Sequence, residues 1–226
     1  SAQDLRPAEV RIAGNMIRIS SEPTLFRTSD GVLFGVEICE DVWAPTPPSN
    51  HLALAGAEII FNLSASDELT GKHNYLMSLL RQQSARTITG YVYASAGFGE
   101  STQDVVYGGN AIICENGSVI AKGQRFAMTE QLVTAQIDIE KLRGDRRSNT
   151  TFTNAQRRMA TEKINIIDMH SACQRDFVLE REIDPTPFIP KSGEMKEKCD
   201  EILNIQAMGL VKRLTHTSCK RVVVGI

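Results

Sequence analysis

The sequence predicts an α/β sandwich of sheets covered by helices. Between about residues 10 and 143, short runs rich in β-branched and aromatic residues alternate with segments of helical periodicity. The dipeptide Asn116-Gly117 separates two such runs and is the strongest short signal for a β-hairpin. Repeated strand–helix–strand order with added hairpins is typical of this fold class.

The first predicted elements lead to a cysteine. Short strands are expected at 16–19 and 24–28, on either side of a turn at 20–23. The apolar run at 31–38 follows a Ser-Asp-Gly turn and predicts a buried strand that ends directly before Cys39.

Caps and breakers bound the next elements. Ser49 is expected to cap a short helix that runs through Ala55 and is stopped by Gly56. Gly90 is expected to end a longer helix. The remaining predicted elements are a strand at 58–63, a helix at 70–89, a strand at 91–96, a hairpin at 111–114 and 119–121, a strand at 131–137 and a short helix capped by Asp138.

Periodicity disappears from Gly144 to about Pro187. The segments 146–152 and 185–190 predict an extended, exposed connection. On it, a solvated face or an interdomain contact would be formed by Arg146, Arg147, Arg157 and Arg158. An amphipathic helix over 192–214 and a buried strand over 221–226 are expected to follow. The predicted organisation is therefore a partial domain at 1–143, a linker at 144–187 and the start of a second domain at 188–226. Both ends look cut, so we expect the natural chain to continue.

Composition argues against several classes of function. The formal net charge is −2, which offers no basic footprint for nucleic acid or an anionic membrane, and no stretch approaches the length of a membrane span. The five cysteines have no CxxC spacing, so we expect no metal site and a reducing, cytoplasmic environment. The four histidines have no ligand spacing and are expected to be structural or at the surface; they are His51, His73, His170 and His216.

Cys39 is the strongest candidate for chemistry. It lies where a strand gives way to a turn or helix start, beside backbone N–H groups that can stabilise a thiolate and later an oxyanion. The alternative is a structural cysteine that packs as a small hydrophobe. Because the acidic pair Glu40-Asp41 follows, the segment is not a simple continuation of the core. Local context leaves both interpretations open.

Several motifs together resemble one family. The segment Gly35-Val-Glu-Ile-Cys-Glu-Asp-Val-Trp43 resembles the nucleophile region of the nitrilase superfamily, and it is most similar to the glutaminase domains of glutamine-dependent NAD⁺ synthetases. The similarity continues in Asn62-Leu-Ser-Ala-Ser66, Gly71-Lys72 and Tyr107-Gly-Gly-Asn110. It extends to the final segment, 221–226, which in that family leads into a glycine-rich pyrophosphate loop that this chain does not contain.

The resemblance implies both a fold and a reaction. The fold is a partial nitrilase-like α-β-β-α sandwich, followed by a linker and the first helix and strand of an α/β adenine-nucleotide hydrolase-like synthetase domain. Cys39 would attack the carboxamide of glutamine within a Glu-Lys-Cys triad. Ammonia would then pass to a domain that uses ATP and Mg²⁺ to amidate nicotinic acid adenine dinucleotide. A homo-oligomer is expected, and this chain itself is expected to bind neither the nucleotide nor the metal.

The Glu and Lys of that triad are not evident in this chain. No lysine precedes Lys72, and the upstream glutamates are Glu9 and Glu22 in irregular segments and Glu37 in the nucleophile strand. We therefore expect the triad partners in a preceding segment and the chain by itself to be inactive.

The resemblance also implies glutamine contacts, each with a structural alternative. Glu40 would serve the oxyanion through its N–H or the substrate amino group through its carboxylate, or else cap a helix start. Trp43 would line the pocket, although a sole Trp is more often a core residue. Ser66 lies at a strand end and is expected to contact substrate. Lys72 would pair with the substrate α-carboxylate, unless it is a solvated cation.

Two rival functions fit parts of the pattern. A stand-alone amidase or nitrilase would share Cys39, but the linker, helix and strand after residue 143 speak against it. A non-catalytic assembly module would explain why the Glu and Lys are missing.

Overall fold

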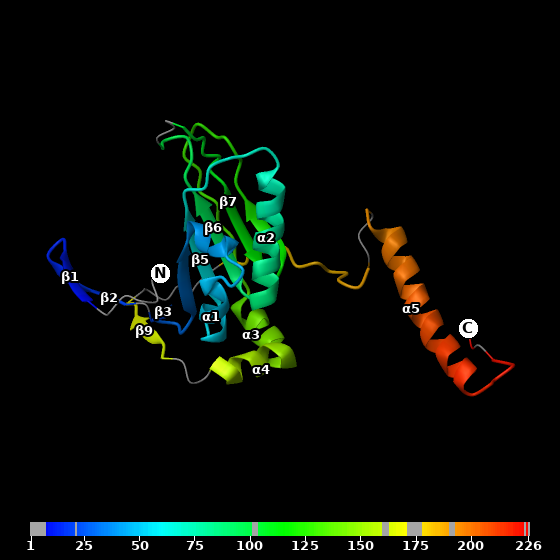
Figure 1. Cartoon of the computed structure of the whole chain (residues 1–226). Coiled ribbons are helices and arrows are strands. Elements are labelled where there is room, and N and C mark those ends of the chain that lie inside the picture. Colours follow the sequence, from blue (N-terminus) through cyan, green and yellow to red (C-terminus); the bar gives the residue numbers. More distant parts are fainter. Residues whose placement is uncertain are drawn as a thin grey trace. The chain divides into compact units, whose positions relative to one another are not determined.

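A computed structural model describes residues 8–20, 22–100, 104–159, 163–170, 178–189, 193–223 and 225 (Figure 1). The chain divides into two units, Ser1–Glu180 and Arg181–Ile226. The first unit holds a two-stranded hairpin, β1 (Ala8–Ile12) with β2 (Asn15–Ile19), and a seven-stranded sheet. Cys173 lies outside the described residues.

The seven-stranded sheet is mixed and has the order β8-β7-β6-β5-β4-β3-β9. Its strands are β3 (Thr24–Arg27), β4 (Leu33–Ile38), β5 (Ile59–Ser64), β6 (Gly90–Ser95), β7 (Ala111–Glu115), β8 (Ser118–Lys122) and β9 (Asn165–Asp168). The central strands β4, β5 and β6 run parallel, with Ile38 opposite Leu63 and Ser64 opposite Ser95. Parallel strands end at the same edge of a sheet, so the residues after these three strands come together.

Helices α1 (Pro48–Leu54) and α2 (Lys72–Thr87) cover one face of this sheet (Figure 1). Helix α1 packs on β4 and β5, where Gly35 permits the approach because a Cβ there would lie 2.9 Å from Leu52 Cδ1. Helix α2 packs on β6, β7 and β8. The buried core between these layers contains Leu25, Val42, Leu52, Ala57, Ile60, Leu76, Leu80, Tyr91, Tyr93, Ile112 and Cys114.

The other face of the sheet carries exposed apolar side chains. Val36 and Ile38 of β4 and Leu63 of β5 are exposed, whereas Glu37 and Asn62 between them are buried toward the helices. This alternation is typical of a strand whose two faces meet different environments. The first unit thus provides a helix layer and a sheet layer of the predicted α-β-β-α sandwich.

The predicted elements up to residue 122 are confirmed, but two predicted boundaries are wrong. Gly90 does not end α2, which ends at Thr87 with Ile88 in the C-cap position; Gly90 is instead the first residue of β6. Helix α1 begins at Pro48 with Pro47 in the N-cap position, and Ser49 lies inside the first turn. Proline is favoured at the first helical position because its missing N–H has no helical acceptor to lose. The predicted cap at Asp138 is confirmed, since its carboxylate accepts a hydrogen bond from the Lys141 N–H at 2.8 Å at the start of α3 (Ile139–Ser148).

The predicted strand at 131–137 is wrong. These residues have no regular secondary structure, and side chains make their hydrogen bonds. The Gln131 amide bonds the N–H and the carbonyl of Gln124 at 2.8 and 2.7 Å, and the Gln136 amide donates to the Val178 carbonyl. An apolar alternation therefore occurs here without a backbone ladder.

The extended, exposed connection predicted at 146–152 is also wrong. Helix α3 and helix α4 (Thr150–Met159) occupy this region, and strand β9 within the predicted linker pairs with β3. Arg146, predicted to be solvated, is buried. The division of the chain after Glu180 keeps all these elements in the first unit.

The helix predicted over 192–214 is present in the second unit as α5 (Met195–His216), but none of its side chains is buried, so no apolar face is packed. The predicted strand at 221–226 is wrong where it is described, because residues 221–223 and 225 have no strand structure. A strand needs a hydrogen-bonding neighbour, and the described residues of this unit contain no other strand. Val224 and Ile226 lie outside the described residues. No helix in the described ranges is long and apolar enough to cross a bilayer.

Candidate active site

Cys39 lies on a sharp turn at the carboxyl edge of the sheet. It follows β4 directly and is the first residue of the 3-10 helix η2 (Cys39–Trp43). Its φ of +48° is in the left-handed region, which a non-glycine residue adopts at a cost. The Asp41 carboxylate holds the turn by accepting the Ile38 N–H at 2.7 Å. Cys39 is half-buried, so its thiol is supported by the fold and still accessible.

The sulfur of Cys39 accepts a hydrogen bond from the next strand. Ser64, the last residue of β5, donates its hydroxyl to Cys39 Sγ at 3.4 Å. Tyr93 of β6, which is 1% exposed, donates its own hydroxyl to Ser64 Oγ at 2.9 Å. Three neighbouring parallel strands therefore contribute to one line of hydroxyl groups that ends on the thiol.

A second chain of hydrogen bonds holds the backbone of Cys39. The Asn62 amide nitrogen lies 3.5 Å from the Cys39 carbonyl oxygen and donates to the Tyr91 hydroxyl at 3.3 Å. The Tyr91 hydroxyl in turn donates to the carboxylate of Glu37, which also accepts the Ser49 N–H at 2.8 Å. Burial and the adjacent Glu37 raise the pKa of Tyr91 well above its usual range, so this hydroxyl remains a donor.

The described glutamates before Cys39 are engaged elsewhere. The Glu37 carboxylate accepts hydrogen bonds from the Tyr91 hydroxyl and the Ser49 N–H, and no hydrogen bond joins it to Cys39 in the described part of the chain. Glu9, expected in an irregular segment, lies in strand β1. Glu22 pairs with Arg18 and Lys163 at 3.4 and 3.0 Å. The geometry therefore assigns none of these three the role of general base.

The predicted glutamine-contact residues lie on the elements around Cys39. Glu40 and Trp43 share η2 with the cysteine, and Glu40 is exposed. Ser66 follows β5, and its N–H donates to Ser95 Oγ at 3.4 Å. Lys72 is the first residue of α2, across from η2. Their roles toward glutamine remain predictions.

Lys72 is not a freely solvated cation. Its ammonium donates to the Asp67 carbonyl at 2.7 Å and to the Asp67 carboxylate at 2.9 Å. It also lies 5.6 Å from the centroid of the Trp43 ring, which stacks on Tyr75 at 5.5 Å. Lys72 holds the pKa of the Asp67 carboxyl below its usual range. The cation and the aromatic ring thus form one surface next to the nucleophile turn.

A polar cluster ties the neighbouring loops together. The Glu68 carboxylate accepts from Asn110 Nδ2 at 2.6 Å and from Arg125 at 2.7 Å, and Asn110 Oδ1 lies 3.1 Å from His73 Nδ1. Gly108 is required beside it, because a Cβ there would fall 2.0 Å from Glu68 Oε1. This cluster fixes the Tyr107-Gly-Gly-Asn110 motif against the segment that follows Ser66.

Sequence reasoning missed the residues that surround Cys39. Asn62 and Ser64, which contact Cys39, lie inside a recognised motif but were not singled out. The same holds for Tyr91 and Tyr93, which lie in a predicted strand and contact Asn62 and Ser64. The available signal was their place on strands adjacent to the nucleophile strand, since polar residues near the ends of parallel neighbours converge on one edge.

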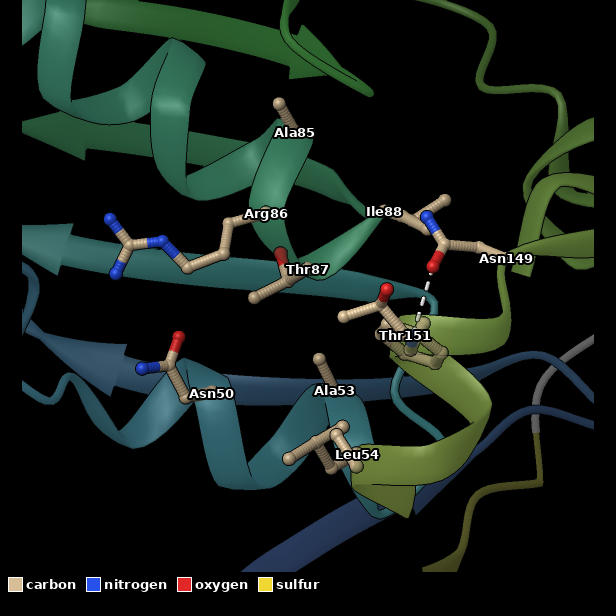
Figure 2. A pocket seen from close by; sticks show the side chains of 11 residues that line it. Asn50, Ala53, Leu54, Ala85, Arg86, Thr87, Ile88, Asn149 and Thr151 are labelled. Carbon is tan, nitrogen blue, oxygen red and sulfur yellow. Dashed lines mark hydrogen bonds between the residues drawn. The ribbon is translucent and has the colours of Figure 1, made fainter. Parts of the chain in front are cut away.

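A cavity of about 410 Å³ lies between α1, the end of α2 and α4 (Figure 2). Its walls are largely apolar, with Ala53, Leu54, Ala85 and Ile88 among them, and Asn149 closes one side by accepting the Phe152 N–H at 2.9 Å. Cys39 and its hydroxyl partners are not among its lining residues.

Comparison with known proteins identifies the family. Residues 9–147 match the carbon-nitrogen hydrolase family. The chain belongs to the carbon-nitrogen hydrolase family. The crystal structure of a carbon-nitrogen hydrolase from Helicobacter pylori G27 has the same fold as this chain. The two align with a TM-score of 0.50 and 21% identity, over 59% of this chain and 48% of the Helicobacter pylori chain. The prediction of a nitrilase-type fold is therefore confirmed.

The similar curated proteins are longer than this carbon-nitrogen hydrolase chain. Glutamine-dependent NAD(+) synthetase of Mycobacterium tuberculosis (strain H37Rv) is 38% identical over 223 residues, which is 96% of this chain and 33% of that protein. The Homo sapiens protein of the same name is 30% identical over 145 residues, 64% of this chain and 20% of that protein. The chain thus spans about a third of the length of the first relative.

Proposed function

We propose that this chain is the nucleophile-bearing part of a glutamine-dependent NAD⁺ synthetase and that Cys39 releases ammonia from glutamine. The observation that carries the proposal is the strained turn at the carboxyl edge, where a half-buried thiol accepts a hydroxyl hydrogen bond from the adjacent strand. Similarity to synthetases across 96% of the chain supports the choice of substrate.

The reaction is an acyl transfer in two steps. The Cys39 thiolate attacks the side-chain amide carbon of glutamine, the C–N bond breaks, and the nitrogen leaves as ammonia after it receives a proton. Water then attacks the γ-glutamyl thioester, which releases glutamate and restores the thiol. Because η2 begins at Cys39, the N–H groups of its first turn have no helical acceptor and can bind the oxyanion of both tetrahedral intermediates.

We assign the proton transfers to a Glu and a Lys outside residues 1–226. Within the described residues, Glu37 is committed to Tyr91 and Ser49, and Lys72 is committed to Asp67. Neither donates to or accepts from the thiol in this arrangement.

We assign the recognition of glutamine to the surface beside the turn. Lys72, partly neutralised by Asp67, would attract the α-carboxylate, and Trp43 would cover the aliphatic chain. Ser66 at the end of β5 would add a hydrogen bond, and Glu40, exposed on η2, would face the α-amino group.

In the whole protein, the ammonia would serve the ATP-dependent amidation of nicotinic acid adenine dinucleotide. In this proposal, ATP and Mg²⁺ act in the part of the whole protein that carries out the amidation. A homo-oligomer and a cytoplasmic location remain predictions from the sequence.

The test is to measure NAD⁺ formation by a full-length protein that contains this chain, with glutamine or with ammonium as the nitrogen source. Cys39→Ala is expected to abolish the glutamine-driven activity, a loss of at least about three decades, and to leave the ammonium-driven activity within twofold. The matched control is Cys199→Ala, which removes a half-buried thiol of the second unit. Equal loss with both nitrogen sources in Cys39→Ala would contradict the proposal.

A further inference from the structure

Ser64 is the one described side chain recorded in hydrogen-bond contact with the Cys39 sulfur, at 3.4 Å. It was not among the residues that the sequence singled out. Its position is fixed by the sheet, because β5 ends at Ser64 and lies between β4, which leads into Cys39, and β6, which carries Tyr93.

The hydroxyl of Tyr93 decides where the proton of Ser64 points. A serine hydroxyl has one hydrogen to donate and two lone pairs to accept with. Tyr93 donates to Ser64 Oγ at 2.9 Å and so occupies a lone pair, which leaves the serine proton directed to the sulfur. Tyr93 is 1% exposed, so the core holds this phenol in place.

We infer that Ser64 is a catalytic residue that donates a hydrogen bond to the Cys39 thiolate, and that Tyr93 is a positioning residue that orients the Ser64 hydroxyl. The inference rests on the proposed function only in taking Cys39 as the nucleophile. A hydrogen bond to a charged acceptor is about twice as strong as one between neutral groups. The donation therefore stabilises the thiolate more than the thiol, and it fixes the direction of the sulfur on a turn that is already strained.

The same hydrogen bond also acts in the deacylation step. When the thioester breaks, the departing sulfur becomes a thiolate again, and the Ser64 hydroxyl lies where that charge appears. Glutamine binding is expected to depend little on Ser64, because the surface assigned to the substrate is formed by Trp43 and Lys72.

The first measurement is the rate at which iodoacetamide alkylates Cys39 in the full-length protein, followed by the mass of the Cys39 peptide. Ser64→Ala is expected to slow alkylation about three- to tenfold at neutral pH. The sulfur loses a donor that stabilises its negative charge, and this loss is partly offset by the greater intrinsic nucleophilicity of a less stabilised thiolate. Ser64→Thr keeps the hydroxyl and is expected to stay within twofold of wild type. Tyr93→Phe is expected to be about two- to threefold slower.

The second measurement separates kcat from KM for glutamine. Ser64→Ala is expected to lower kcat by roughly one to two decades and to change KM by less than twofold. Ser78→Ala is the matched control, because it removes an exposed hydroxyl that donates to the Asn74 carbonyl within α2. The Cys199 peptide serves as the internal reference for alkylation.

Unchanged alkylation of Cys39 in Ser64→Ala would overturn the inference, as would equal slowing in Ser64→Ala and Ser64→Thr. If Ser64→Ala does not fold, Tyr93→Phe decides, and wild-type alkylation in that variant also overturns it. Alkylation requires no glutamine, so these outcomes remain distinct from a failure of the proposed function, which Cys39→Ala tests by itself.

Discussion

The two ends of the central parallel strands use polar residues for opposite purposes. At the carboxyl end, hydroxyl groups converge on a thiol that remains half-buried and accessible. At the amino end, Arg146 donates to main-chain carbonyls, Arg143 pairs with Glu58, and Arg146 is only 7% exposed.

Arg146 provides hydrogen-bond donors for main-chain carbonyls at the amino end of the sheet. Its guanidinium donates to the Ala57 carbonyl at 2.6 Å and to the Thr87 and Ile88 carbonyls at 3.1 Å each, and it lies 4.9 Å from the centroid of the Phe152 ring. Burial lowers the pKa of Arg146 to about 10. Three carbonyl groups that precede β5 and β6 are satisfied by one side chain.

This contrast shows that polar side chains have different roles at the two ends of one sheet. At the amino end, Arg146 donates to three main-chain carbonyls, and the expected gain is stability. At the carboxyl end, the proposed nucleophile is held on a strained turn, and the expected gain is chemistry. Substitutions at the first end should therefore change the free energy of unfolding, and those at the second should change the reaction.

The largest expected effect concerns the carboxyl end in isolation. A polypeptide of residues 1–226 is expected to release no measurable ammonia from glutamine, because removal of general acid–base and oxyanion-stabilising groups typically costs two to four decades each. The measurement is ammonia release at a concentration matched to the full-length protein, with folding followed by circular dichroism. Turnover within tenfold of full length would place the acid–base partners inside residues 1–226.

The amino end is tested by Arg146→Met. The variant keeps much of the apolar stem but leaves three buried carbonyls without a donor, so the free energy of unfolding is expected to fall by about 3 kcal/mol or more. Alkylation of Cys39 in the folded variant is expected to stay within twofold of wild type. Arg147→Met, at the exposed neighbour, is the control and should change stability by less than about 0.5 kcal/mol. A large loss of Cys39 reactivity in folded Arg146→Met would contradict the claim that the amino end affects stability and not the reaction at the carboxyl end.

Ser66→Ala and Lys72→Ala test the proposed glutamine contacts at the carboxyl end. Each is expected to raise the glutamine KM by about one to two decades, because a hydrogen bond to a charged ligand group contributes roughly 1.5–3 kcal/mol. Steady-state kinetics with glutamine measures the effect, and ammonium-driven turnover is the internal control. A variant whose glutamine KM does not move identifies that residue as structural.

The smallest expected effect concerns the pH dependence of stability and the buried core between the two ends. Cys114 on β7 is fully buried, and burial raises its pKa to about 11 from an ordinary value near 9. The folded state then keeps a proton that the unfolded state loses above pH 9, so stability is present below pH 9 and declines as pH rises to 11. Between pH 8 and 10 the loss is about 1.4 kcal/mol. Chemical denaturation of wild type and Cys114→Ala at both pH values measures it, and equal pH slopes would show that Cys114 contributes nothing.

Much of the fold was predictable because its signals are local. The apolar run before Cys39, the Asn116-Gly117 turn and the cap at Asp138 act over a few residues, and each is found where the pattern placed it. Cys39 was also a candidate from local context, because an acidic turn follows it, although that context left a structural role open.

Tertiary structure decided the rest. Whether 131–137 forms a strand depends on a neighbour with free backbone groups, and the glutamine side chains take that role instead. Arg146 is buried because carbonyls from two distant strand starts need its donors, a requirement that no local pattern expresses. The contact between Ser64 and Cys39 spans 25 residues and exists because β4 and β5 pair in parallel in one register. The sequence by itself determined most of the elements and the candidate nucleophile, and the long-range pairing of strands determined which side chains surround that residue.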